Sequence, residues 1–117
     1  MLEVIDSNIF LTRGDTALLK IDIQDIDGKD FMHTTQSFKL IFTVKKYCGS
    51  QYSVIKKVLH STDAFELEPE DTNKLPFGEY FYDVELQMNN KIFTIITPHK
   101  FILQKEVSMK NDDINRE

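Results

Sequence analysis

Apolar and polar side chains alternate with a period of two along much of this chain. In residues 79–88 the even positions are Tyr80, Tyr82, Val84 and Leu86, and the odd positions are Glu79, Phe81, Asp83 and Glu85. Successive side chains of a β-strand point to opposite faces, so this pattern is typical of a strand between a core and water. Residues 16–23 and 37–45 show the same alternation.

Shorter apolar segments predict further strands over 2–11, 52–59, 63–68, 91–97 and 100–107. Turn-forming residues separate them at 25–28, 48–50 and 89–90. One turn of helix is expected over 69–75, because Pro69 and the acidic residues after it suit a helix start.

Seven to eight short strands at this spacing predict an all-β fold, an antiparallel immunoglobulin-like β-sandwich. The domain is expected over residues 1–107, followed by a polar, flexible tail over 108–117. The expected core comprises Leu19, Ile21, Phe38, Leu40, Phe42, Leu67, Tyr80, Tyr82, Val84 and Leu86.

Composition fits a single globular domain, since 41% of the 117 residues are hydrophobic and 28% are charged. Nineteen acidic residues against 14 basic ones give a net charge of −5, which argues against nucleic acid as a ligand. The chain has one cysteine, Cys48, so no internal disulfide is possible and synthesis in a reducing cytoplasm is expected. Neither a signal peptide nor a membrane-spanning apolar segment is expected.

The sequence contains no local signature of catalysis. His33, His60 and His99 are scattered, and neither a nucleophile elbow nor a glycine-rich phosphate loop is present. Cys48 follows two lysines but has no nearby histidine, so an incidental loop thiol is expected. We therefore expect a protein that is not an enzyme and needs no cofactor.

Three aspartates around Gly28 resemble a calcium loop: Asp25, Asp27 and Asp30. With Gly28 at the sixth loop position, Ile23 occupies the first position and Thr34 the twelfth, where calcium loops carry carboxylates. A hairpin turn with solvated carboxylates is the expected structure, and no metal is expected.

The most specific segment runs from Asp71 to Val84. It enters a strand through Gly78 and places Tyr80 two residues before a second core-facing aromatic residue, Tyr82. This arrangement predicts a tyrosine corner, in which the Tyr80 hydroxyl bonds a backbone group between Asp71 and Phe77. Gly78, Tyr80, Tyr82 and Asp71 are therefore expected to have structural roles.

Residues 91–97 are apolar on both faces, unlike a strand that is half exposed to water. Phe81 adds an outward aromatic side chain on the neighbouring strand. We expect an interface formed by Phe81 with Phe93 and Ile95, or with Ile92 and Ile96. The alternative is that a terminal segment, 2–11 or 108–117, covers this surface.

The order of these motifs resembles small immunoglobulin-like modules of phages and prophages, such as the N-terminal domain of baseplate upper proteins. The resemblance covers residues 9–107 and rests on Arg13-Gly14-Asp15-Thr16, the Asp27-Gly28 turn, Phe42-Thr43-Val44-Lys45-Lys46, Glu70-Asp71-Thr72 and the segment from Leu75 to Leu86. Baseplate upper proteins continue into a long second half, so we expect a separate baseplate, tail-fibre attachment, neck or head-associated component.

The resemblance implies a non-catalytic structural protein of the virion, made in the bacterial cytoplasm. Its partners would be other virion proteins or further copies of the chain. A carbohydrate-binding sandwich remains the alternative. Such domains present exposed aromatic platforms, and here only Tyr47 and Tyr52 are expected at the surface.

Overall fold

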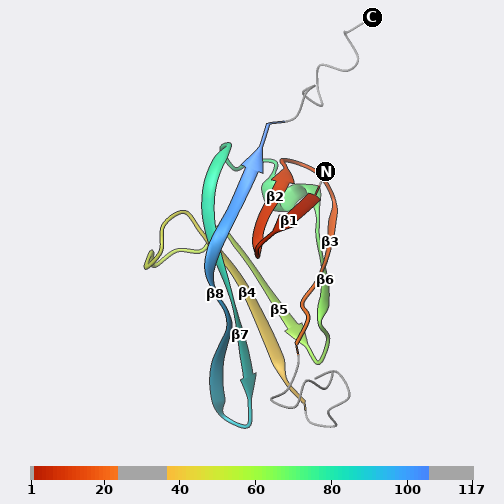
Figure 1. Cartoon of the computed structure of the whole chain (residues 1–117), viewed down its shortest axis with the longest axis vertical. Coiled ribbons are helices and arrows are strands. Elements are labelled where there is room, and N and C mark those ends of the chain that lie inside the picture. Colours follow the sequence, from red (N-terminus) through yellow and green to blue (C-terminus); the bar gives the residue numbers. More distant parts are fainter. Residues whose placement is uncertain (1, 24–36, 106–117) are drawn as a thin grey trace, which may run out of the picture.

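The structure, a computed structural model, describes residues 2–23 and 37–105. Nearly all of its regular structure is strand, as predicted (Figure 1). The strands are β1 (Leu2–Ile5), β2 (Asn8–Thr12), β3 (Ala17–Lys20), β4 (Lys39–Lys45), β5 (Ile55–His60), β6 (Ala64–Leu67), β7 (Gly78–Met88) and β8 (Lys91–Gln104). The predicted helical turn is α1 (Pro69–Thr72).

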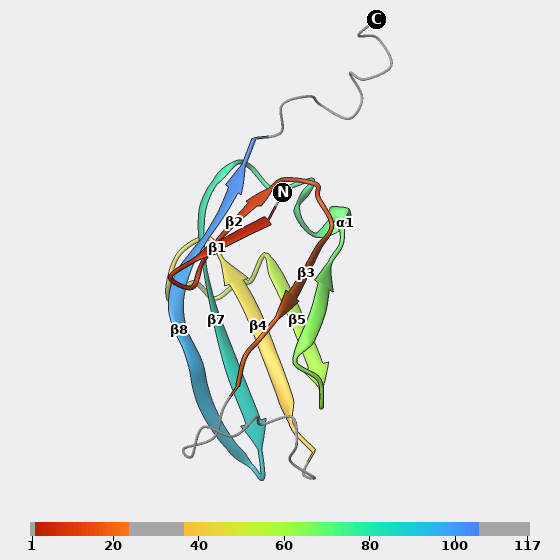
Figure 2. The ribbon, with the colours of Figure 1, turned by 45° about the vertical axis from the view of Figure 1, so that its right-hand side comes forward.

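The strands form two sheets. The larger sheet has the order β1-β2-β8-β7-β4-β5, and the smaller one pairs β3 with β6. Figures 1 and 2 show β3 and β6 lying across one face of the larger sheet. The face of the larger sheet that points away from β3 and β6 is called the outer face below.

The prediction of a wholly antiparallel sheet is wrong at one strand pair. β2 runs parallel to the end of β8, with Ile9 opposite Phe101 and Thr12 opposite Gln104. A tight turn at Asp6 reverses β1 onto β2, but β2 and β8 are joined only through the rest of the domain. Such a long connection leaves the relative direction free, whereas a short hairpin would force an antiparallel pair. The larger sheet is therefore mixed.

The predicted strands 91–97 and 100–107 are one long strand, β8. Its register with β7 shifts twice, between Tyr82 and Val84 and between Val84 and Glu85. Pro98 lies within the first irregularity, because Tyr82 pairs with His99 and Val84 pairs with Ile96. Proline has no backbone N–H group to donate to a neighbouring strand, which is tolerated at such a bulge. The strand therefore continues through Pro98.

The core lies between the two sheets, and all ten residues predicted for it are buried. Phe42 of β4 is at its centre and is 1% exposed. The ring centroid of Phe42 lies 4.7 Å from that of Phe65 in the smaller sheet and 5.4 Å from that of Tyr82 in the larger one. These aromatic contacts join the sheets.

β7 and β8 form a long hairpin, which we call the ribbon. Asn89 and Asn90 make its two-residue turn with positive φ angles of 55° and 62°, and Met88 pairs with Lys91 across it. Asparagine adopts this conformation more readily than most residues, which accounts for the pair at this position. Within the described residues, no helix has the length and apolar character needed to cross a bilayer.

Candidate functional site

The tyrosine corner has the predicted hydrogen bond. The Tyr80 hydroxyl donates to the Pro76 carbonyl at 2.7 Å, inside the expected range of 71–77. The residue is 2% exposed, and burial raises the pKa of its hydroxyl. Gly78 makes the approach possible, because its φ of +134° is rarely adopted by residues with a side chain. This corner fixes the backbone that enters β7.

Asp71 contributes to the same segment from α1. Its carboxylate accepts the Glu68 backbone N–H at 2.8 Å and pairs with Lys57 of β5 at 2.9 Å. The first contact belongs to a capping box, which satisfies a backbone group at the helix start. Asp71 therefore has its partners within the fold, in agreement with a structural role.

Tyr82 connects the ribbon to the N-terminal hairpin. Its hydroxyl donates to the Ser7 carbonyl, and burial raises the pKa of this hydroxyl too. The contact holds the β1–β2 turn against the larger sheet beside the core. Tyr82 is thus a second structural tyrosine of β7.

We expect Tyr80→Phe to lower the free energy of unfolding by about 0.5–1.5 kcal/mol, the usual net contribution of one hydrogen bond. Urea denaturation followed by far-UV circular dichroism measures the change. Tyr52→Phe is the matched control, because Tyr52 is 78% exposed and should show no effect. Equal stability of Tyr80→Phe and the unsubstituted chain would show that the corner bond contributes nothing.

The structure separates the residues expected to form one interface. Phe93 pairs with Leu86 and therefore lies on the core side of the larger sheet, beyond the small sheet, where it is 47% exposed. Phe81 pairs with Lys45 and lies on the outer face. Ile95 is half-buried and packs against the core. Phe81 and Phe93 thus belong to different surfaces.

Ile92, which belongs to the alternative set, lies on the outer face with Phe81, where Phe93 was expected. Ile92 pairs with Gln87, which points to the same side as Phe81, and it is 64% exposed. Val58 of β5 pairs with Ile41 of β4 on this side and is 44% exposed. No described strand or helix packs on the outer face, so these apolar side chains have no covering layer within residues 2–23 and 37–105. The 2–11 segment lies at the sheet edge instead of over 91–97.

A groove of about 260 Å³ lies on the outer face around Phe81. Its lining combines Thr43 and Phe81 with side chains of both charges, Lys45, Lys56, Asp83 and Glu85. Cys48 and Pro98 also line it. An apolar ring among mixed charges suits contact with another protein surface better than it suits a single charged ligand.

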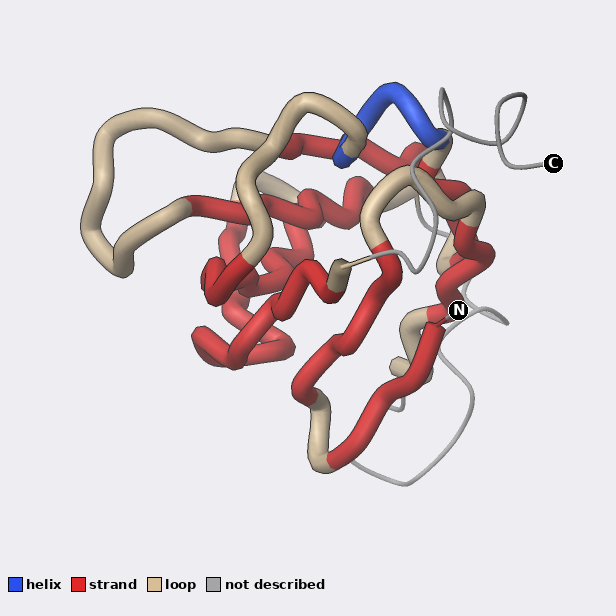
Figure 3. Tube along the Cα trace, turned by 90° about the horizontal axis from the view of Figure 1, so that it is seen from above, coloured by secondary structure: helices blue, strands red, loops and turns tan. Residues whose placement is uncertain are grey.

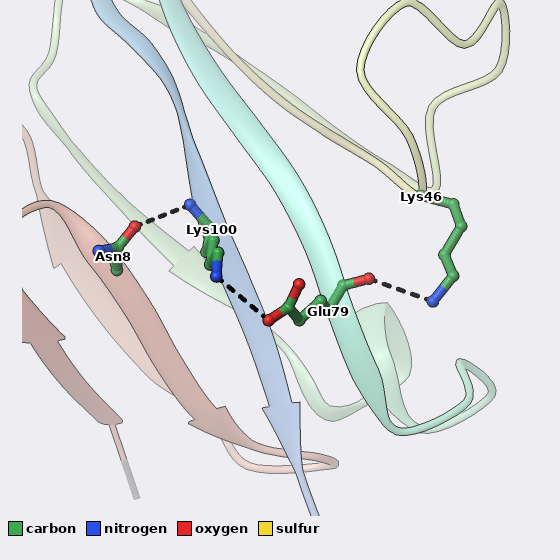
Figure 4. Close-up of polar contacts among 4 residues, drawn as sticks. All are labelled: Asn8, Lys46, Glu79 and Lys100. Carbon is green, nitrogen blue, oxygen red and sulfur yellow. Dashed lines mark hydrogen bonds and ion pairs between the residues drawn. The ribbon is translucent and has the colours of Figure 1, made fainter.

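Figure 4 shows how the edge of β8 is protected where β2 begins. The Lys100 backbone N–H donates to the Asn8 side-chain oxygen at 2.9 Å, and its ammonium pairs with the Glu79 carboxylate at 3.3 Å. Lys46 in turn donates to the Glu79 carbonyl at 3.1 Å. In the part of β8 that precedes Lys100, residues 91–97 have no strand partner on the side away from β7 within the described chain. That half of β8 is a free edge.

The loop over 46–54 extends away from the sheets (Figure 3). Tyr47 and Tyr52 are 66% and 78% exposed, as expected, but they are not the only aromatic residues at the surface, since Phe93 and Phe77 are exposed too. The Ser50 backbone N–H donates to the Tyr47 carbonyl at 3.1 Å, and Lys45 donates to the Ser50 carbonyl at 2.7 Å. The loop is therefore held in shape while its aromatic rings reach solvent.

The groups considered for catalysis or metal binding do not converge in the described chain. His60 lies on β5, His99 lies on β8 with Nδ1 against the Thr97 carbonyl, and Cys48 is exposed in the 46–54 loop. Within residues 2–23 and 37–105, no three His, Cys, Asp or Glu side chains are placed to hold a metal ion. His33, the aspartates around Gly28 and the 108–117 tail lie outside the described residues.

Sequence reasoning placed the half-buried Ile41 on the outward side of its strand but named neither Ile41 nor Val58 as an interface residue. The signal was present, because Ile41 falls at an outward position between Lys39 and Thr43 in an alternating strand. Val58 carried a weaker signal, since its strand has adjacent lysines that interrupt the alternation.

Compared with protein-family models, curated proteins and solved structures, the chain matches none of them.

Proposed function

We propose that this protein is a non-catalytic structural and interaction module of a bacteriophage particle, located in the virion, where it binds other virion proteins. The uncovered outer face of the larger sheet is the observation that supports this most. It carries Val58 of β5, Phe81 of β7 and Ile92 of β8 without a covering layer from the described chain. Apolar surface of this kind marks protein–protein interaction sites.

The proposed fold is an immunoglobulin-like sandwich with one parallel strand pair, β2 with β8. Support comes from the small β3–β6 sheet lying across the larger one and from the Tyr80 corner at the start of β7. The framework residues that resemble phage modules lie in these elements. Gly78 and Tyr80 shape the corner, Phe42 joins the sheets and Asp71 caps α1.

Particle composition tests the proposal. The chain, Phe81→Asp and Val58→Asp are each expressed in place of the native copy in the host that produces the particle, and purified particles are quantified by mass spectrometry. We expect the unsubstituted chain in the particles at a fixed stoichiometry. Each outer-face variant should be reduced at least tenfold, because a buried unpaired carboxylate opposes docking.

Val4→Asp is the matched control, since Val4 is an apolar residue 52% exposed on β1, away from the centre of the outer face. It should enter particles normally. Circular dichroism of each purified variant shows whether it is folded. If Phe81→Asp is not folded, Val58→Asp alone tests the outer face. Particles that lack the unsubstituted chain would overturn the proposal. Glycan binding that depends on Tyr47 and Tyr52 would instead favour the carbohydrate-binding alternative.

A further inference from the structure

A basic hollow lies at the tip of the ribbon. It has a volume of about 560 Å³ and is lined by the tip, the start of β4 and the end of β5. Its ionisable side chains are Lys39, His60 and Lys91, and none of the described residues lining it is acidic. The exposed Ile92 lies at its margin. The hollow therefore combines positive charge with an exposed apolar side chain.

The outward side of the small sheet has the opposite charge. Leu18 of β3 is 70% exposed and pairs with Glu66 of β6. Glu68, two residues further on, is exposed on the same side. The hydrogen bond that Glu68 shares with Glu66, and the charge of Glu66, raise the pKa of the Glu68 carboxyl. Lys20 is the one basic residue within β3 and β6. We call the surface formed by Leu18, Glu66 and Glu68 the Leu18 face. It is an exposed leucine next to two carboxylates that lie close to each other.

The hollow has residues from both faces of the larger sheet, and Lys91, paired with Met88, lies on the core side. Its outer-face side and the Leu18 face point in opposite directions. Lys39, Gln87 and Ile92 form one row on the outer face of the larger sheet. Leu18 and Glu66 point outward from the small sheet, whose other side packs on the core. A single chain cannot bring the hollow onto its own Leu18 face, but two chains in head-to-tail order can.

We propose, resting on the virion role proposed above, that the partner at the ribbon tip is a second copy of this chain, whose Leu18 face docks in the basic hollow. Leu18 meets Ile92, and Glu66 and Glu68 meet Lys39 and His60, which pair with each other on the outer face. The contact joins two different surfaces and is heterologous, so repeated contacts build a ring if the rotation closes and a filament if it does not. The complementary charges orient the copies although the chain as a whole carries −5.

Two variants that each lose one surface provide the test. Lys39→Glu/Ile92→Asp alters the outer-face side of the hollow, and Leu18→Lys/Glu66→Lys alters the Leu18 face. Sedimentation equilibrium from 10 to 500 µM in low salt measures the mass of each sample. We expect the average mass of the unsubstituted chain to rise with concentration. Association should be tighter at lower salt, because screening weakens contacts between exposed charges. Each variant alone should remain monomeric.

The decisive sample is an equal mixture of the two variants. Each supplies the surface that the other lacks, so a heterologous contact gives a 1:1 dimer and nothing larger. A mixture that stays monomeric while the unsubstituted chain associates would overturn the proposal, as would an unsubstituted chain that is monomeric throughout. Val4→Asp is the control and should associate normally. Lys39→Glu and Glu66→Lys as single changes repeat the test if a double variant is not folded.

The virion role and the head-to-tail contact can fail separately. Particle entry that depends on Phe81 and Val58, with an unsubstituted chain that remains monomeric, would keep the virion role and reject the second copy as partner. If the mixed variants form dimers but the chain is absent from particles, the head-to-tail contact would be kept and the virion role rejected.

Discussion

Phe42→Ala should lower the free energy of unfolding by about 3–5 kcal/mol, the range measured for large aromatic residues truncated in cores. Phe42 is 1% exposed and its ring contacts aromatic rings from both sheets, those of Phe65 and Tyr82. Truncation removes apolar burial and leaves a cavity at the place where the sheets are joined. In a domain of this size the loss corresponds to a fall in Tm of at least about 10 °C.

Guanidinium denaturation with linear extrapolation measures the change. Phe93→Ala is the matched control, because the same atoms are removed from a side chain that is 47% exposed. Its effect should stay near or below about 1 kcal/mol. A Phe42→Ala loss below about 1 kcal/mol would mean that β4 presents its other face to the core.

Gly78→Ala should cost about 1–3 kcal/mol of stability, and the reason lies in the backbone alone. The φ of Gly78 is +134°, whereas a β-carbon placed there would come no closer than 3.8 Å to the Lys46 ammonium. Space is therefore available, but the conformation is strained for alanine. Relief of this strain would move the start of β7, so part of the Tyr80 corner should be lost with it.

Gly49→Ala provides the comparison, since Gly49 also has a positive φ, +81°, in the exposed 46–54 loop. That loop can relax, and an angle near the left-handed region costs less than one at +134°. Thermal unfolding of the two variants should place Gly78→Ala below Gly49→Ala. The reverse order would show that the corner tolerates a shifted backbone.

The parts of this small domain that hold the fold together differ from the parts that are exposed for contact with partners. The Tyr80 corner, α1 and the aromatic core hold the sheets in place and have their hydrogen-bond partners inside the fold. The exposed surfaces described above are the outer face, the free edge over 91–97, the 46–54 loop, the Leu18 face and the hollow at the ribbon tip. This separation allows substitutions at Val58 or Ile92 to report on assembly without large effects on stability, since both are exposed.

The sequence alone identified most of the segments that form strands and the core-facing side chains of β4 and β7, but not the division of 2–11 into β1 and β2 or the continuity of β8. Alternation in residues 37–45 and 79–88 predicted the buried faces correctly, because the pleat of a strand places every second side chain on one side. Pro69 and the acidic residues after it predicted α1, and Gly78 with Tyr80 predicted the corner bond, since both depend on residues close in sequence.

Only the tertiary structure decided how the strands are joined and where the surfaces lie. β2 runs parallel to β8 because a long connection leaves direction free, and alternation contains no information on direction. Residues 91–97 are apolar at both odd and even positions, so alternation does not show which side chains face the core. The face of each side chain is set by the pairing with β7 and by the two register shifts. For the same reason Phe93, grouped with Phe81 from the sequence, lies on the other side of the sheet, and Ile92 shares the outer face with Phe81.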